Sequence, residues 1–165
     1  MTRIPGLLVK IEVVGASLFD AICYVMWLEG SKDALVVDPG PGTAEGVREV
    51  LESQDLAVGA VLLTHGHIDH VWQCAAVSAG RPVYIPEPDL ALIENPMGAL
   101  GMRASALGIG EWQYPEVVVP LGSEQFNPVE GITVRVIPAP GHSPGSSVFL
   151  FAPTPTDAPM ALSGD

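Results

Sequence analysis

The chain has 165 residues, of which 48% are hydrophobic and only 16% are charged, against roughly 25% charged residues in an average soluble domain. This length suits one domain with a substantial core, and the 18 glycines and 16 prolines exclude long helices and coiled coils. The net charge of −12 repels phosphate backbones and anionic lipid surfaces, so we expect neither nucleic acid nor a membrane as a partner.

The sequence gives no sign of export or of membrane insertion. Charged residues interrupt the apolar stretches, so no run approaches the roughly 18 apolar residues of a spanning helix. Arg3 is the sole early cation and no clean apolar segment follows it, which argues against a secretory signal. The two cysteines, Cys23 and Cys74, form neither a disulfide framework nor a CxxC pair. We therefore expect a cytoplasmic protein.

The hydrophobic pattern predicts strands that alternate with short helices. Strands are expected at residues 7–14, 21–28, 34–38, 57–64, 82–85, 116–121, 131–137, 146–151 and 159–163. Helices are expected from a Thr43 cap through residue 53, from Asp69 to about residue 78, and over residues 89–94. Residues 95–110, rich in glycine and methionine, are expected to form a loop. This order of elements indicates an α/β (α+β) fold.

The four histidines are the chemically informative residues. His65, His67 and His70 fall within six residues at the end of a predicted buried strand, and His142 lies in a turn rich in proline and glycine. Residues i and i+2 of an extended backbone project to the same side, so His65 and His67 can present their imidazoles to one ion. Imidazole and carboxylate groups suit zinc, iron or manganese. Asp69 and His70 can turn toward a neighbouring position, which makes two adjacent ion sites geometrically feasible.

The segment from Thr64 to His70 resembles the HxHxDH signature of the metallo-β-lactamase superfamily, and it follows a buried strand as in that family. Three further motifs agree in order, namely Asp38-Pro39-Gly40, Pro140-Gly141-His142-Ser143-Pro144-Gly145 and Ser163-Gly164-Asp165. Within the superfamily, the chain is most similar to the glyoxalase II-like hydrolases. The PGHSPGS stretch supports this, as does Asp165 at the bridging position where one β-lactamase subgroup has cysteine.

The resemblance implies a ligand set for two metal ions. The implied ligands are His65, His67 and His142 for the first ion, Asp69 and His70 for the second, and Asp165 as the bridge. Zn²⁺ is the expected metal, with iron or manganese as alternatives. Asp69 is also the expected catalytic residue. Asp38 would be a buried residue that orients a ligand histidine and would not itself bind the metal.

The family fold is a four-layer αββα sandwich, and residues 1–165 are expected to form one metallo-β-lactamase-like domain of this kind. In the family, the last strands, a covering helix and one further metal-ligand histidine follow the position of Asp165. We therefore expect the sequence to be C-terminally incomplete, lacking those last strands and that helix.

The resemblance implies a metal-dependent hydrolase that cleaves a thioester or a similar small acyl substrate with a metal-bound hydroxide, as hydroxyacylglutathione hydrolases do. The first alternative is a persulfide dioxygenase, which has similar motifs but uses one iron ion and molecular oxygen. The second is a non-catalytic domain that associates with a partner or with another copy of itself. Iron content and oxygen uptake would separate the two enzymes, and concentration-dependent association without turnover would favour the non-catalytic domain.

Asp69, His142 and Ser143 also have interpretations that do not involve a metal ion. Asp69 lies where a helix begins, and aspartate is a common N-cap residue. His142 would be an isolated turn residue if it did not meet the other histidines. Ser143 lies beside a histidine and would be a nucleophile if a base and an oxyanion site accompanied it. The clustering of the histidines favours metal ligation over these interpretations.

Overall fold

The computed structural model describes residues 9–98, 104–151 and 160–165. One sheet contains β1 (Val9–Gly15), β2 (Ile22–Leu28), β3 (Asp33–Val37), β4 (Ala57–Leu62), β5 (Val83–Pro86) and β6 (Val118–Leu121), in that order. A second sheet contains β7 (Gln125–Val129), β8 (Ile132–Pro138), β9 (Ser147–Phe151) and β10 (Met160–Leu162), in the order β10-β9-β8-β7. The second sheet is antiparallel, whereas the first is antiparallel from β1 to β3 and parallel from β3 to β6.

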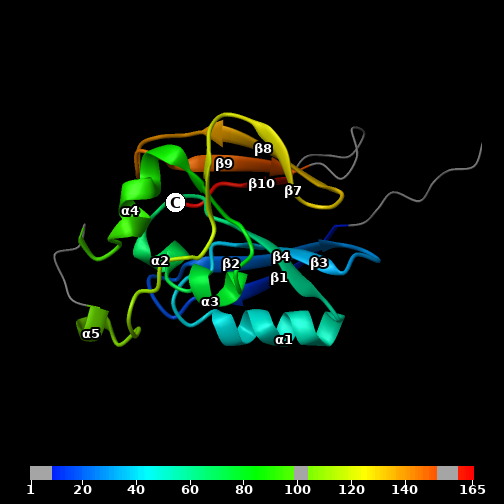
Figure 1. Cartoon of the computed structure of the whole chain (residues 1–165), viewed down its shortest axis with the longest axis horizontal. Coiled ribbons are helices and arrows are strands. Elements are labelled where there is room, and N and C mark those ends of the chain that lie inside the picture. Colours follow the sequence, from blue (N-terminus) through cyan, green and yellow to red (C-terminus); the bar gives the residue numbers. More distant parts are fainter. Residues whose placement is uncertain (1–8, 99–103, 152–159) are drawn as a thin grey trace, which may run out of the picture.

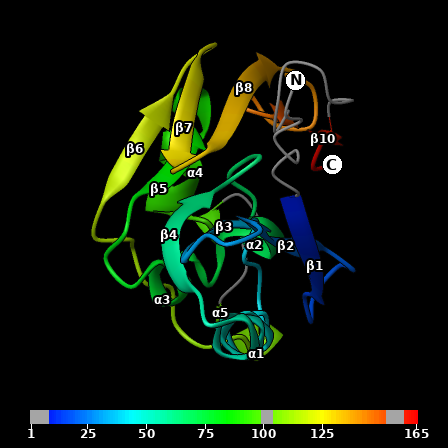
Figure 2. The ribbon, with the colours of Figure 1, turned by 90° about the vertical axis from the view of Figure 1, so that its right-hand side faces the viewer.

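The helices are short. They are α1 (Ala44–Gln54), α2 (Ile68–Val71), α3 (Cys74–Ser78), the 3₁₀ helix η1 (Glu87–Asp89), α4 (Leu90–Glu94) and α5 (Ala104–Leu107). Within the described ranges, none of them combines the length and the apolar character that crossing a membrane requires. Figures 1 and 2 show α1 and α3 on the face of the first sheet that points away from the second sheet.

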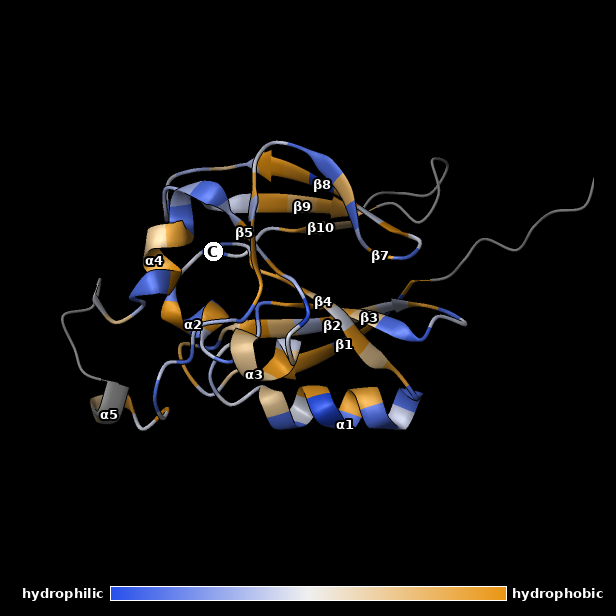
Figure 3. Ribbon diagram, in the orientation of Figure 1, coloured by the Kyte–Doolittle hydropathy of each residue, from blue (hydrophilic) through white to orange (hydrophobic). Residues whose placement is uncertain are grey.

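Two hydrophobic clusters hold these layers together, and the alternation of side chains along β2 divides them. Val25 and Trp27 face the helices, where they join the cluster that contains Val47 of α1. Met26 faces the other way, into the cluster that contains Phe149 of β9. The hydropathy colouring shows the same arrangement, with apolar strands inside and a mixed apolar and polar surface on α1 (Figure 3). The described part of the chain is therefore layered as helices, first sheet and second sheet.

All nine predicted strands have a counterpart among the described residues, although residues 7, 8 and 159 of the predicted ranges lie outside them; β7 was not predicted. Pro128 interrupts its pattern, and a proline inside a run argues against a strand. The structure tolerates Pro128 because β7 is an edge strand, and its pairing with β8 shifts register between Phe126 and Val129. The predicted loop over residues 95–110 contains α5, and residues 99–103 of it lie outside the described ranges.

Two expectations about the helices differ from the structure. Thr43 is the N-cap residue of α1, as predicted, but its hydroxyl makes no cap hydrogen bond and donates to the carbonyl of Gly40 at 2.8 Å instead. The single helix expected from Asp69 is two short helices, α2 and α3, with residues 72 and 73 between them. Gln73 explains the break, since its backbone N–H donates to the Pro39 carbonyl and its side-chain oxygen accepts from the Ala44 N–H at the start of α1.

Both cysteines belong to the core, as predicted. Cys23 and Cys74 are fully buried, free and part of the cluster between the first sheet and the helices. Burial raises the pKa of the Cys74 thiol to about 12. Burial and the nearby charge of Asp38 raise the pKa of Cys23 as well. Neither thiol is therefore a reactive nucleophile.

Candidate metal centre

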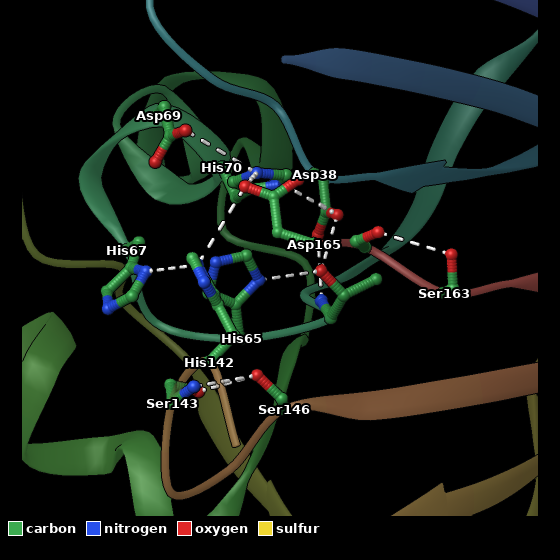
Figure 4. Close-up of polar contacts among 12 residues, drawn as sticks. Asp38, His65, His67, Asp69, His70, His142, Ser143, Ser146, Ser163 and Asp165 are labelled. Atoms are coloured by element: carbon green, nitrogen blue, oxygen red, sulfur yellow. Dashed lines mark hydrogen bonds and ion pairs between the residues drawn. The ribbon is translucent and has the colours of Figure 1, made fainter. Parts of the chain in front are cut away.

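The candidate site lies at one edge of the two sheets, where the loops that follow several strands meet (Figure 4). β3 and β4 are parallel, so their carboxyl ends lie side by side. Asp38 follows β3, and the segment that begins at Leu63 follows β4. The second sheet supplies His142 from the loop before β9 and Asp165 from the segment after β10. The Ser147 N–H donates to the Thr64 carbonyl at 3.1 Å, which ties the second sheet to this edge.

His65 lies at the centre of a cluster of four imidazole rings. Its ring centroid is 4.8 Å from that of His67, 4.3 Å from that of His70 and 4.9 Å from that of His142. His67 Nδ1 lies 2.8 Å from His142 Nε2. The structure therefore brings together all four histidines that the sequence marked as candidate ligands, and His142 is not an isolated turn residue.

Two of the rings present an unpartnered nitrogen to the site. The Nε2 atoms of His65 and His70 are buried and have no hydrogen-bond partner. Thr64 Oγ1 donates to Asp38 Oδ2 at 2.6 Å, so it accepts the Nδ1 proton of His65, which lies 3.0 Å away. Asp38 Oδ2 also accepts from His70 Nδ1 at 2.9 Å. The Nε2 atom of each ring is thereby free to bind a metal ion. In His70 this atom becomes available once it loses its proton. These residues therefore fit a metal centre.

Asp38 is the buried orienting residue that the sequence predicted. Its side chain is 3% exposed and its backbone has a φ of 52°, a left-handed conformation that aspartate adopts more readily than most residues. Oδ1 accepts the backbone N–H of Thr64 at 2.7 Å, while Oδ2 serves the Thr64 hydroxyl and His70. One carboxylate therefore fixes His70 directly and His65 through Thr64. No local sequence pattern indicated this role of Thr64.

The carboxylates of Asp165 and Asp69 differ in whether they belong to a group of candidate metal ligands. His65, His67 and His142 form one group of candidate ligands, and His65, His70 and Asp165 form a second. Asp165 Oδ2 lies 3.5 Å from His70 Nε2 and 3.8 Å from His142 Nε2, between the two groups. Asp69 belongs to neither group, although its Oδ2 lies 3.6 Å from His70 Nε2. The second group thus contains His65 where the sequence predicted Asp69.

The simpler interpretations of Asp69 and Ser143 do not agree with the structure. The N-cap of α2 is His67 and no side chain caps this helix, so Asp69 is not a cap residue. Ser143 is 3% exposed, and its hydroxyl donates to Asp89 at 2.5 Å. A buried hydroxyl that faces a carboxylate is not placed to attack a substrate.

The sequence predicted only a helix start at Asp89, and nothing in its local pattern indicated the contact between Asp89 and Ser143.

The histidine pKa values respond to burial and to the neighbouring charges in opposite ways. Burial and the positive charge of His70 lower the pKa of His65 to about 4. Burial also lowers the pKa of His70, but the hydrogen bond to Asp38 and the charges of Asp38, Asp69 and Asp165 outweigh it and raise that pKa to about 9. In the metal-free protein at neutral pH, His65 is therefore neutral and His70 carries a proton.

These shifts predict that the metal-free protein is most stable near pH 6.5. The stabilisation from His70 is complete below its ordinary pKa of 6.5 and is lost as the pH rises through about 9. The contribution of neutral His65 to the folding stability is complete above pH 6.5 and is lost as the pH falls toward 4. Urea unfolding in the presence of a chelator, measured from pH 5 to 10, should show both limbs. A His70→Gln variant that keeps the full alkaline limb would contradict the role of His70.

The sequence matches known proteins over most of its length. A model described as the metallo-beta-lactamase superfamily matches residues 18–154. An uncharacterized protein of Mycobacterium tuberculosis is 37% identical over 155 residues, which are 91% of this chain and 69% of that protein. The hydroxyacylglutathione hydrolase of Haemophilus influenzae is 30% identical over 150 residues, which are 86% of this chain and 66% of that protein.

Solved structures show the same fold. The B3 metallo-beta-lactamase BLEG-1 matches with a TM-score of 0.71 and 26% identity, over 86% of this chain and 67% of that one. TTHA1623, solved in a di-iron-bound form, matches with a TM-score of 0.65 and 29% identity, over 84% of this chain and 65% of that one. The family model covers most of the chain, and the clustered histidines lie within its range. This chain therefore belongs to the metallo-β-lactamase superfamily.

Proposed function

We propose that the protein is a metal-dependent hydrolase that cleaves thioesters of small thiols. The observation that carries this proposal is the pair of candidate ligand groups that share His65, because adjacent metal ions are suited to hydrolysis. The superfamily includes hydrolases, among them a probable metallo-hydrolase of Streptococcus pyogenes that is 28% identical over 134 residues. The 30% identity to a hydroxyacylglutathione hydrolase favours a thioester as the substrate.

In this proposal the chain holds two metal ions. The ligands are His65, His67 and His142 for the first ion, Asp69 and His70 for the second, and Asp165 between them. The position of Asp165 Oδ2 between His70 and His142 supports its bridging role. Imidazole and carboxylate ligands suit zinc, and they suit iron and manganese as well. We propose Zn²⁺ as the resident metal, and elemental analysis decides between zinc and the iron of TTHA1623.

A cleft of about 200 Å³ lies beside these ligands and can hold a substrate. Its lining includes the apolar and aromatic side chains of Phe19, Tyr24 and Leu162, together with His70 and Asp165. The apolar side chains can contact the acyl group and the thiol-bearing portion of a thioester, and the polar residues can orient its carbonyl group. Metal ions bound here lower the pKa of a water molecule and polarise a carbonyl group.

Water is the nucleophile in this proposal, because the two cysteines and Ser143 are not placed to attack a substrate. Cys23 and Cys74 are fully buried in the core, and the Ser143 hydroxyl is directed to Asp89. Asp69 is 8% exposed, and its carboxylate lies close to His70. From this position the carboxylate can accept a proton from the attacking water. This is the catalytic role that we propose for Asp69.

Thioester hydrolysis can be tested directly with the purified, zinc-loaded protein. We expect hydroxyacylglutathione to release free thiol faster than a chromogenic cephalosporin opens, and we expect a chelator to stop both reactions. An Asp69→Asn variant should keep the zinc ion of the three-histidine site but release thiol about 10²–10⁴-fold more slowly, since general base catalysis is worth about that factor. Asp33 is exposed at the start of β3 and does not line the cleft, so the Asp33→Asn variant is the matched control and should match the native rate.

Other results would redirect the assignment. β-Lactam turnover without thioester turnover would contradict the proposed substrate. Oxygen uptake with glutathione persulfide by an iron-containing preparation would identify a dioxygenase instead. Concentration-dependent association with no turnover of any of these compounds would favour the non-catalytic domain.

A further inference from the structure

Asp89 is a buried carboxylate with no cationic partner. It is the last residue of η1, and it is 0% exposed. Among the described residues, no lysine, arginine or histidine forms an ion pair with it. A buried charge without hydrogen bonds is strongly unfavourable. The Asp89 carboxylate must therefore be stabilised by the groups that donate hydrogen bonds to it.

Three donors, from two separate loops, meet on this carboxylate. Oδ2 accepts the backbone N–H of Gly66 at 2.8 Å and the hydroxyl of Ser143 at 2.5 Å. Oδ1 accepts the backbone N–H of Gly145 at 2.6 Å. Gly66 lies between His65 and His67, and Ser143 directly follows His142. One carboxylate therefore joins the two loops that carry the first group of candidate ligands.

The two glycines allow this close approach. A Cβ atom on Gly66 would lie 3.2 Å from Asp89 Cβ and 3.1 Å from its carbonyl oxygen. A Cβ atom on Gly145 would lie 2.6 Å from Asp89 Cγ. Larger residues at these positions would push the loops away from the carboxylate. Gly66, Gly145 and Ser143 thus all contact Asp89, and a Cβ atom on Gly66 would also lie 2.7 Å from Leu92 Cβ.

We infer that Asp89 is a positioning residue that sets the distance between the His65–His67 segment and His142, and thereby the metal affinity of the first site. The inference rests on the proposed metal-dependent function. Side-chain–backbone hydrogen bonds fix both loops relative to η1, so His67 Nδ1 and His142 Nε2 are held 2.8 Å apart by residues outside the ligand set. Residues that support metal ligands in this way contribute to affinity without touching the metal.

The Asp89→Asn variant tests this inference. It keeps the shape of the side chain, but its amide NH₂ group replaces an acceptor and opposes one of the three donors. We expect the affinity for Zn²⁺ to fall about 10–100-fold in a chelator competition, the loss typical of changing a group that supports a ligand. We also expect the visible absorption bands of the Co²⁺-substituted protein to shift, because they report the coordination geometry.

A matched control separates this effect from a general loss of stability. Glu87 lies on the same 3₁₀ helix but is exposed, so the Glu87→Gln variant should keep the native affinity and the native Co²⁺ bands. If Asp89 were only a structural residue, Asp89→Asn would lower the melting temperature of the metal-free protein and leave the affinity and bands unchanged. That result would overturn the inference.

A second variant decides the question if Asp89→Asn does not fold. Ser143→Ala removes one donor and leaves both backbone hydrogen bonds, so we expect a smaller loss of affinity together with shifted Co²⁺ bands. Native affinity and native bands in Ser143→Ala would then overturn the inference. Failure of the proposed function is distinguishable, because in that case the native protein itself would bind no Zn²⁺ or Co²⁺.

Discussion

The His65→Ala variant is expected to lose the metal ion of the three-histidine site. His65 offers one buried, unpartnered nitrogen, Nε2, and in the proposed ligand set this atom binds the first ion together with His67 and His142. Zinc sites with four ligands bind with about 10–16 kcal/mol, so one ligand corresponds to about 2.5–4 kcal/mol, or roughly 100- to 1,000-fold in affinity. Elemental analysis after dialysis against a weak chelator measures the loss.

The His67→Ala variant is the matched comparison. His67 belongs to the same three-histidine group, so both variants should lose the first ion and keep the second, which Asp69, His70 and Asp165 would hold. Circular dichroism of both metal-free variants should remain native-like, because the two hydrophobic clusters contain neither histidine. Equal metal content in His65→Ala and the native protein would mean that the imidazole cluster is not the metal site.

The proximity of the candidate residues was predictable from the sequence where they are contiguous. His65, His67, Asp69 and His70 follow one strand, so their proximity was predictable from the local backbone alone. The meeting of His142 with them was a long-range contact, and only the order of the motifs indicated it. The structure brings these residues together because β4 and the loop before β9 end at the same edge.

The supporting residues were harder to predict because their roles depend on tertiary contacts. Thr64 acts through its hydroxyl, which connects Asp38 to His65. Asp89 precedes α4 and resembles an ordinary helix start, yet its carboxylate lies against Gly66 and Gly145. No local pattern specifies which distant amides a buried carboxylate will meet, so this part of the site required the folded structure.

The fold was likewise predictable where a local pattern specifies an element, and not where tertiary contacts decide. The strand pattern was strong wherever a strand is buried on one face or both, as in β2 and β4. It failed for β7, which has one buried residue and contains Pro128, because pairing with β8 stabilises that edge strand more than its own propensity does. The separation of α2 from α3 was equally invisible, since it depends on a hydrogen bond from Gln73 to Pro39.

The Asp38→Ala variant should show the largest loss of folding stability. Removing this carboxylate leaves the Thr64 N–H, the Thr64 hydroxyl and His70 Nδ1 without their acceptor, all of them buried. Breaking a buried, hydrogen-bonded charge pair costs about 3–5 kcal/mol. For a chain of this length, that loss lowers the melting temperature by about 10 °C, which differential scanning calorimetry of the metal-free protein would measure.

The Asp55→Ala variant is the control for the backbone at this position. Asp55 also has a left-handed backbone, with a φ of 54° against 52° at Asp38, so both substitutions place alanine in the same unfavourable conformation. Asp55 is exposed and pairs with Lys32 at the surface, where an ion pair contributes little. The difference between the two melting temperatures therefore isolates the buried network. If the two variants lost the same stability, the cost would come from the backbone conformation, and Asp38 would not hold Thr64 and His70 in place.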